Sequence, residues 1–313
     1  MRPRKNAVFI ILILLSIAIL VTFSEIALNA AVEAVELCLY TLVPSLFPIM
    51  FLSSSLLNLL ATTHIPILDR ICRICKAPSG SENILLAGLL GGYPVGAKLI
   101  AESYMQGSIQ KEDAQRLLGF CNNAGPAFIF GVIGHAFSSL QISLVLWGMH
   151  ITSAVITGCI IPKMIHNKLA HPRGIKVTRR SLITHCVSTM GLICGWVILF
   201  RILIAFLFAV LPSYVPAEFI VLISGILELS NGCTLLNTIA DPASRFLIAN
   251  CLISLGGFCV ALQTAGIAHT IGLHYYFPGK IIQTAISTII SVIMQAILFT
   301  ACSCCPFINK ASP

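Results

Sequence analysis

Glycines and small polar side chains that could bind a solute are gathered at four breaks in otherwise apolar stretches of the chain. Two breaks lie in the first half, at residues 91–96 and 122–126, and two lie in the second half, at residues 228–232 and 254–257. Non-helical backbone at membrane depth is tolerated only where it is buried in protein or lines a water-filled cavity. Matching breaks in two halves of a membrane protein are the best sequence indication of a transporter's binding site. The residue types therefore predict reversible binding of a small polar solute.

The first two breaks carry donors that suit an anion. Half-length helices that start near Val95 and at Pro126 would direct free N–H groups and a partial positive charge toward the breaks. Lys98 follows the first break and could face an anionic solute, or it could pair with Glu102 one turn further on. The adjacent amides at 122 and 123 are costly at membrane depth without partners, which favours a site over a simple helix cap. The predicted solute-binding residues of this half are Gly91, Gly92, Tyr93, Pro94, Gly96, Lys98, Asn122, Asn123, Gly125 and Pro126.

The third break contains a carboxylate that could couple solute movement to a cation. Glu228, if unpaired, could carry a proton, or it could hold Na⁺ together with neighbouring polar side chains and unwound carbonyl groups. A salt bridge from Glu228 to Arg201 or Lys98 is the structural alternative, and the sequence leaves the three open. The second-half residues predicted to bind solute are Ser230, Asn231, Gly256, Gly257 and Gln263. For Gln263 the alternative is a hydrogen bond between helices.

The composition places these breaks inside a membrane. The chain has 313 residues, of which 57% are hydrophobic and only 10% are charged, whereas a soluble domain carries about 25% charged residues. The net charge of +8 comes from Lys and Arg in short loops between apolar stretches. Such clusters are orientation signals in membrane proteins, and they lack the interleaved aromatic residues of a nucleic-acid surface. The predicted partners are the lipid bilayer and a small solute, with no nucleic acid.

Cysteine usage and motifs give no indication of catalysis. Most of the 13 cysteines stand singly in apolar runs, where a free thiol behaves as a small hydrophobe. Cys72 and Cys75 have half of a zinc-ribbon spacing, but no second pair lies nearby. The chain has no hydrolase elbow, phosphate-binding loop or dinucleotide fingerprint. We therefore expect that the protein is not an enzyme and that it has no cofactor and no metal site.

The apolar stretches divide the chain into two similar halves. Residues 1–24 are expected to form an N-terminal transmembrane anchor, with a cleaved signal peptide as the alternative. Repeat 1 (25–161) would contain an interfacial helix, a span, a re-entrant hairpin (82–106), a broken helix (110–137) and a span (139–161). After a basic loop (162–180), repeat 2 (181–302) would contain a span, a hairpin (217–240), a broken helix (242–271) and a span (280–302), followed by a tail (303–313). Asp241 and Pro242 are typical of a helix start.

The positive-inside rule orients these elements. With the N-terminus in the cytoplasm, the basic clusters at residues 70–76 and 163–180 also fall in the cytoplasm. Each repeat then crosses the membrane an odd number of times, so the second repeat is inverted relative to the first. The predicted fold is an all-α polytopic membrane protein with two inverted repeats, each holding a re-entrant hairpin and a broken helix, plus an N-terminal helix.

Four segments, at residues 89–98, 122–128, 225–232 and 256–263, resemble a known family. They look like the sporulation integral membrane proteins of the YlbJ type, which carry the nucleoside-recognition or Gate domain. The resemblance runs from about residue 27 to the last span, and the Gly-Gly-Tyr-Pro-Val-Gly-Ala-Lys run is its most specific part. The broken-hairpin plan is more distantly similar to concentrative nucleoside transporters. The resemblance implies a bacterial cell membrane, a role in sporulation and movement of dipicolinate across a forespore membrane.

Together these observations predict a transporter of a small polar solute, an anionic carboxylate such as dipicolinate, that works by alternating access around a midplane site. A coupling proton or sodium ion is a further expected partner. Transport of a nucleoside is the alternative within the same class. A non-transporting membrane scaffold for spore or envelope assembly is the alternative from another class. A homo-oligomer is compatible with the sequence.

Overall fold

The protein is an all-α, multi-pass membrane protein, as predicted. The computed structural model describes residues 2–60, 63, 65–78, 80–162, 179–211 and 214–295. Within these ranges all regular secondary structure is helical. Helices there that are long and apolar enough to cross a membrane are Ser24–Leu60, Leu140–Ile160, Leu182–Ala209, Pro242–Ile267 and Tyr276–Gln295. Most of the predicted basic loop (162–180), the tail (303–313) and the end of the predicted last span lie outside the described residues.

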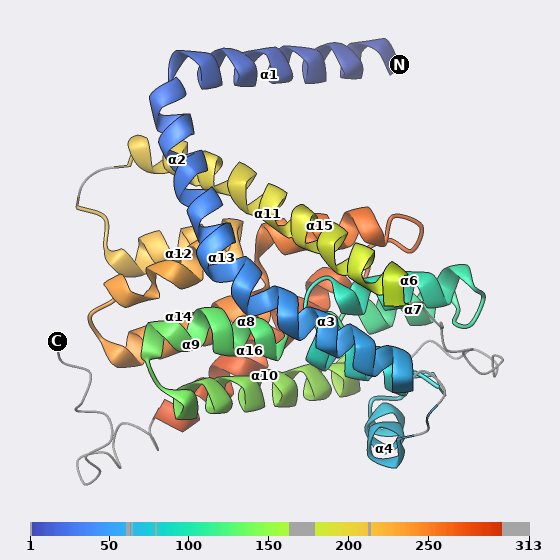
Figure 1. The fold of residues 1–313 in the computed structure, drawn as a ribbon. Coiled ribbons are helices and arrows are strands. Elements are labelled where there is room, and N and C mark those ends of the chain that lie inside the picture. Colours follow the sequence, from blue (N-terminus) through green and yellow to red (C-terminus); the bar gives the residue numbers. More distant parts are fainter. Residues whose placement is uncertain are drawn as a thin grey trace, which may run out of the picture.

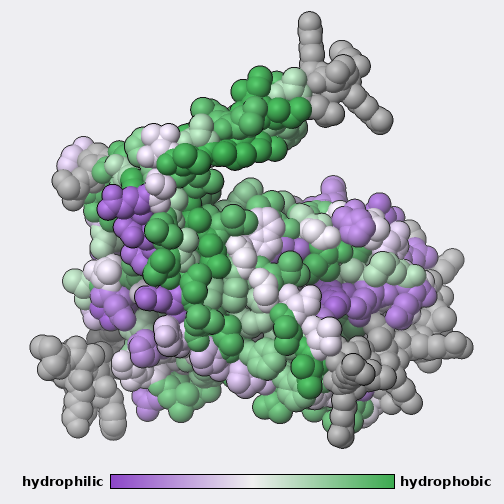
Figure 2. All heavy atoms as spheres, turned by 45° about the horizontal axis from the view of Figure 1, so that its top comes forward, coloured by the Kyte–Doolittle hydropathy of each residue, from purple (hydrophilic) through white to green (hydrophobic). Residues whose placement is uncertain are grey.

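The N-terminal helix α1 (Arg2–Thr22) lies apart from the helical body and leads into α2 (Figure 1). Its large apolar side chains from Val8 to Val21 are exposed. Figure 2 shows this helix as an almost continuous apolar surface. A helix that is apolar on every side has the surface expected for contact with lipid.

The next stretch differs from the predicted interfacial helix followed by a separate span. The helices α2 (Ser24–Leu37) and α3 (Val43–Leu60) are joined through a π-helical turn, η1 (Cys38–Leu42), into one curved stretch (Figure 1). Pro44 and Pro48 lie just after this turn. Prolines remove backbone donors, and π-turns widen a helix, so both bend a helix without ending it. After α3 comes the short amphipathic helix α4 (Pro66–Ile74).

Each half contains a helical segment that turns back on itself at a break. In the first half, α5 (Glu82–Leu86) and η2 (Ala87–Gly91) are followed by α6 (Val95–Met105), which packs against both of them. In the second half, α12 (Ala217–Leu227) is followed by α13 (Leu229–Thr234) and η4 (Leu235–Thr238), and α13 packs back against α12. These elements lie within the residues of the two predicted hairpins, 82–106 and 217–240.

Each half also contains a helix interrupted near its middle. In the first half, α7 (Lys111–Leu118) is followed after a break by α8 (Pro126–Phe128), η3 (Ile129–Ile133) and α9 (Gly134–Phe137). In the second half the pair is α14 (Pro242–Leu255) and α15 (Gly257–Ile267). Asp241 caps α14, as predicted, by accepting hydrogen bonds from Ala243 N and Ser244 N. The Ser244 hydroxyl also donates to Asp241, which lowers the pKa of that carboxyl.

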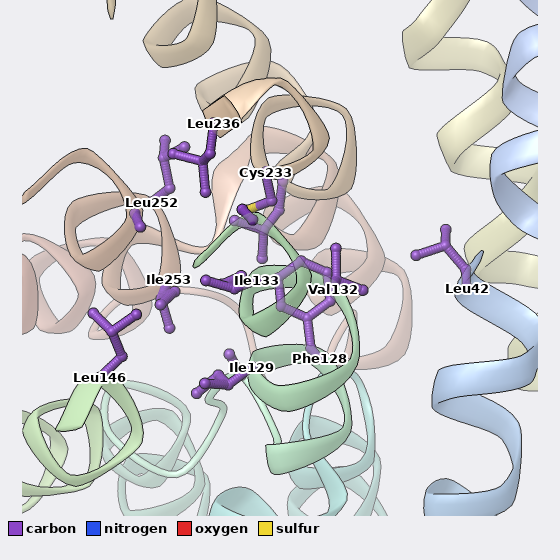
Figure 3. Packing of buried hydrophobic residues seen from close by; sticks show 14 of the residues in the cluster. Leu42, Phe128, Ile129, Val132, Ile133, Leu146, Cys233, Leu236, Leu252 and Ile253 are labelled. Atoms are coloured by element: carbon purple, nitrogen blue, oxygen red, sulfur yellow. The ribbon is translucent and has the colours of Figure 1, made fainter. Parts of the chain in front are cut away.

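Long helices surround these broken elements. They are α10 (Leu140–Ile160), α11 (Arg179–Ala209) and α16 (Tyr276–Gln295). Helix α11 packs against α2, and α16 packs against both α10 and α14. Figure 3 shows the core between the halves, where Phe128, Ile129 and Ile133 of the first broken helix lie near side chains of α13 and α14. This core cluster therefore contains side chains from both halves.

Arg116 fastens α7 to the end of α10. Only 1% of its surface is exposed, and its guanidinium donates to the carbonyl oxygens of Gly158 at 2.7 Å and Ile161 at 3.3 Å. It also donates to the carbonyls of Cys75 and Lys76. The last carbonyls of a helix carry partial negative charge and need donors. One cation therefore satisfies the end of α10 and the chain that follows α4.

We expect Arg116→Met to lower stability strongly, because four buried carbonyl groups would lose their donor. An unsatisfied buried polar group costs about 1–3 kcal/mol, and partial relaxation would leave a total loss of about 3 kcal/mol. Thermal unfolding of the purified protein in detergent measures the effect. Arg70→Met, at an exposed position on α4, is the matched control, and equal unfolding temperatures for the two variants would contradict this role.

Candidate functional site

The first and second breaks are in direct backbone contact. Gly92 has a positive φ of 70°, and a Cβ added there would lie 2.8 Å from the backbone nitrogen of Gly125. A Cβ on Gly125 would likewise lie 2.8 Å from Gly92 Cα. Close by, a Cβ on Gly96 would lie 2.2 Å from the carbonyl oxygen of Cys121. The glycines are required because no side chain fits where these backbones cross.

The third and fourth breaks meet in the same way and also touch the first. Gly257, with a φ of 77°, approaches the hairpin so closely that an added Cβ would lie 2.8 Å from Gly225 O and 3.4 Å from Leu229 N. Gly256 ends α14 in the left-handed conformation, which favours glycine. A Cβ on Gly256 would lie 2.7 Å from the hydroxyl oxygen of Tyr93. All four breaks are therefore gathered in one place.

A pocket of about 60 Å³ lies where the breaks meet. A volume of this size holds a few water molecules, so a larger solute would require the surrounding segments to move apart. The sequence-predicted residues that line the pocket are Gly91, Gly92, Tyr93, Gly125, Glu228, Ser230 and Gln263. The other lining residues are apolar: Leu46, Met50, Ala127, Phe128, Ile193, Leu229 and Val260. Few polar groups in an apolar lining are typical of a small-molecule site.

Helix starts supply partial positive charge around the pocket. Pro126 and Leu229 are the first residues of α8 and α13, and α6 and α15 begin at Val95 and Gly257. The first N–H groups of a helix lack intrahelical partners and favour negative charge. The predicted residues Pro94 and Pro126 stand at two of these starts, and the Tyr93–Pro94 peptide bond is cis.

Glu228 is a buried carboxylate at one of these helix starts. Its Oε1 accepts a hydrogen bond from Ser230 N at 3.0 Å, and its Oε2 accepts one from Asn231 N at 2.7 Å. Neither predicted salt bridge forms, because Arg201 pairs with Glu33 across 2.5 Å and Lys98 lies beside Glu102. Within the described ranges, no cation lies within ion-pair distance of the Glu228 carboxylate.

Three other predicted side chains differ in their surroundings. The side-chain amide of Asn231 has no hydrogen-bond partner among the described residues, although the residue is only 1% exposed. Gln263 lines the pocket and donates to Cys259 Sγ of its own helix at 3.3 Å. Lys98 is not a lining residue: its Nζ lies 2.5 Å from His185 Nδ1 and 3.9 Å from Glu102 Oε1. The structure therefore places Lys98 outside the pocket.

A polar network centred on Lys280 lies behind Tyr93. Lys280 Nζ donates to Gln283 Oε1 at 3.0 Å, and to Asn123 Oδ1 and Tyr93 Oη at 3.3 Å each. Gln283 Nε2 also donates to Asn123 Oδ1 at 3.0 Å, and Asn123 Nδ2 donates to Phe120 O at 2.7 Å. Lys280 is only 1% exposed, and Asn123 and Gln283 are fully buried. The predicted residue Asn123 thus belongs to a network around a buried amine.

Two more buried polar side chains flank this network. Asn122 Nδ2 donates to Thr264 Oγ1 at 2.9 Å, while its Oδ1 has no partner among the described residues. His150 Nε2 accepts a hydrogen bond from Ala124 N at 3.2 Å. The other ring nitrogen must then carry the proton, and this Nδ1 also lacks a partner in the described part of the chain. Buried polar groups without partners are costly, and such groups are common where a ligand binds.

Lys280, Gln283 and His150 are functional candidates that the sequence interpretation missed. Lys280 starts a span, where lysine usually extends its amine to the membrane surface, and His150 looks like a packing residue. A usable signal was nevertheless present. Polar residues recur along α16 at helical spacing and are buried on one face: Lys280, Gln283, Ser287 and Ser291. A polar stripe on an otherwise apolar span faces protein rather than lipid.

The described cysteines are free thiols, and most of them are buried. Cys72 and Cys75 both lie in the core cluster beneath α4. In the described part of the chain, no group of three or more His, Cys, Asp or Glu side chains is placed to hold a metal ion. The polar side-chain groups described at the site are amides, hydroxyls, a carboxylate, an amine and an imidazole, which suit reversible binding.

Comparison with curated proteins places the chain among membrane proteins. It is similar to the sporulation integral membrane protein YlbJ of Bacillus subtilis (strain 168), with 24% identity. The aligned region covers 82% of this chain and 75% of that relative. No family model matches the sequence, and no solved structure matches the chain. The similarity supports the resemblance seen in the motifs and a multi-pass membrane location.

Proposed function

We propose that the protein transports a small anionic carboxylate, such as dipicolinate, across a bacterial membrane. The observation that carries the proposal is a pocket lined by residues of the first three breaks, with the fourth break packed against the first and the third. Irregular backbone among membrane helices is tolerated where it lines a cavity, and transporters use it to bind solutes. A scaffold that only held other proteins would need no such buried polar junction. The proposed transport also requires no covalent chemistry from the polar groups of the pocket.

We further propose that the halves are inverted repeats that move against each other around the pocket. Both halves present the same order of helix, folded-back segment, broken helix and long helix. Equivalent elements pack on each other, α2 on α11 and α10 on α16. The returning arm of each folded segment also contacts the broken helix of the other half, α6 on α15 and α13 on η3. These crossed contacts are what a two-fold relation between repeats would produce.

The buried Lys280 amine beside the pocket favours an anion over a neutral nucleoside. The Lys280 amine donates a hydrogen bond to the hydroxyl of Tyr93, a lining residue of the pocket. A neutral ring would gain little from a buried amine. Glu228, which lines the pocket and has no described cation beside it, is the proposed group for a coupling proton or Na⁺.

The basic clusters and the curated relative together support a proposal for the orientation and location of the protein in the cell. We propose a cytoplasmic N-terminus, because this orientation keeps the basic clusters inside. The relative is named as a sporulation protein, which supports a role in sporulation and a site in the forespore membrane.

Uptake into proteoliposomes tests the transport function. We expect vesicles with the purified protein to accumulate labelled dipicolinate well above empty vesicles, with competition by other aromatic carboxylates and none by nucleosides. Uptake of labelled nucleosides instead would favour the nucleoside alternative. Absence of uptake for both classes, with correctly inserted protein, would favour the scaffold.

A further inference from the structure

Lys280 is separated from the pocket by a single side chain. Tyr93 lines the pocket, and its hydroxyl accepts a hydrogen bond from Lys280 Nζ at 3.3 Å. The same nitrogen lies 5.3 Å from the centre of the Tyr93 ring. On the other side of the hydroxyl stands Gly256, where a Cβ would lie only 2.7 Å from Tyr93 Oη. Tyr93 is therefore the partition between the pocket and the buried amine.

The amine has no anionic partner in the described part of the chain. Its three acceptors are neutral oxygens, from Tyr93, Asn123 and Gln283. No described carboxylate lies within ion-pair distance of Lys280 Nζ. A buried ammonium group without a counter-charge is costly. An arriving anion would remove that cost, so it would be bound far more strongly than by a lysine that already has a carboxylate neighbour.

An unpartnered donor lies beside the same network. His150 Nδ1 is buried and has no described partner, and the other ring nitrogen of His150 is held by Ala124, the residue after Asn123. Lys98 offers a contrast. It lies between Glu102 and His185, its side chain is 39% exposed, and it does not line the pocket. The two lysines therefore differ in the feature that matters for an anion, because only Lys280 is a buried amine without a described carboxylate partner.

We propose that Lys280 binds the anionic group of the transported solute, and that the Tyr93 side chain moves aside to admit it. The inference rests on the proposed function and names the residue that selects for negative charge. The solute class it implies is a carboxylate whose charged group enters between Tyr93 and Asn123, while the rest of the molecule occupies the apolar pocket.

Calorimetric titration of the purified full chain in detergent tests this role. The probes are pyridine-2,6-dicarboxylate and its neutral diamide, which share a shape and differ in charge. We expect the wild type to prefer the dicarboxylate by about 100-fold, because charge-assisted hydrogen bonds are roughly twice as strong as neutral ones. Lys280→Met should lower this preference at least tenfold while leaving the diamide affinity within threefold. Lys111→Met, at an exposed lysine of α7, is the matched control and should keep the wild-type preference.

A second variant answers the question even if Lys280→Met fails to fold. Asn123→Asp would place a carboxylate at the position that now accepts from Lys280 Nζ at 3.3 Å. It should reduce dicarboxylate affinity at least tenfold, while the new ion pair with Lys280 offsets part of the stability lost with the hydrogen bond to Phe120 O. The inference is overturned if either variant keeps the wild-type preference, or if Lys98→Met loses it instead. A wild type that binds no dicarboxylate would refute the proposed function itself, and this inference with it.

Discussion

Gly92→Ala is expected to abolish uptake and to lower the unfolding temperature markedly. Gly92 has a φ of 70°, and its added methyl group would lie 2.8 Å from Gly125 N. The backbone conformation, with a φ of 70° and a ψ of −173°, is essentially restricted to glycine and alone costs about 1–3 kcal/mol for a residue with a Cβ. The contact with Gly125 adds to this, because a backbone atom cannot rotate away, and the total loss should reach about 3 kcal/mol. Separation of the first two breaks would also open the pocket wall.

Gly107→Ala is the matched control for this prediction. Gly107 also has a positive φ, of 69°, but a Cβ there would meet nothing within 4 Å. It should therefore show only the backbone cost, and uptake should remain close to that of the wild type. Thermal unfolding in detergent and uptake of labelled dipicolinate measure both variants. If the two variants had the same unfolding temperature and the same uptake, the close approach of the first two breaks would not be needed for transport.

Replacement of Glu228 should separate its structural role from its coupling role. Glu228→Ala would leave Ser230 N and Asn231 N without their acceptors, at a cost of about 2–4 kcal/mol for two buried donors. Glu228→Gln retains an oxygen that can accept one of these bonds, so the protein should still fold and bind solute. Without the carboxylate, however, uptake should no longer respond to a proton or sodium gradient.

The measurement for Glu228 is uptake with and without an imposed pH or Na⁺ gradient, together with the unfolding temperature. We expect the Gln variant to keep a basal rate and lose the stimulation by the gradient. Stimulation equal to that of the wild type would exclude Glu228 as the coupling group and leave it as a helix cap only.

Much of the fold could be predicted because its signals are local. Long apolar runs specify spans, and Gly92, Pro94, Gly125 and Gly256 mark breaks through their own backbone preferences. The start of α14 followed from one Asp-Pro pair, since an N-cap acts over three residues. The joined helix from Ser24 to Leu60 was missed because a π-turn leaves no distinct sequence pattern.

The roles of the lysines could not be predicted from local signals. Lys98 lies within a motif and beside a break, yet it faces Glu102 and His185. Lys280 stands at the head of a span, yet the packing of α10 and α14 on α16 buries it. Whether a long cationic side chain reaches the surface or turns inward depends on neighbouring helices, which are distant in sequence.

Solvent access to Ser230 tests the central claim, that the meeting breaks form a solute pocket, most directly. We expect Ser230→Cys, in membranes, to react with a small charged thiol reagent, and dipicolinate to slow that reaction about tenfold, because bound solute would cover a lining residue. Lys111→Cys, at an exposed position on α7, should react with the reagent but gain no protection from dipicolinate. A Ser230→Cys thiol that never reacts, or that reacts equally fast with and without dipicolinate, would contradict the account.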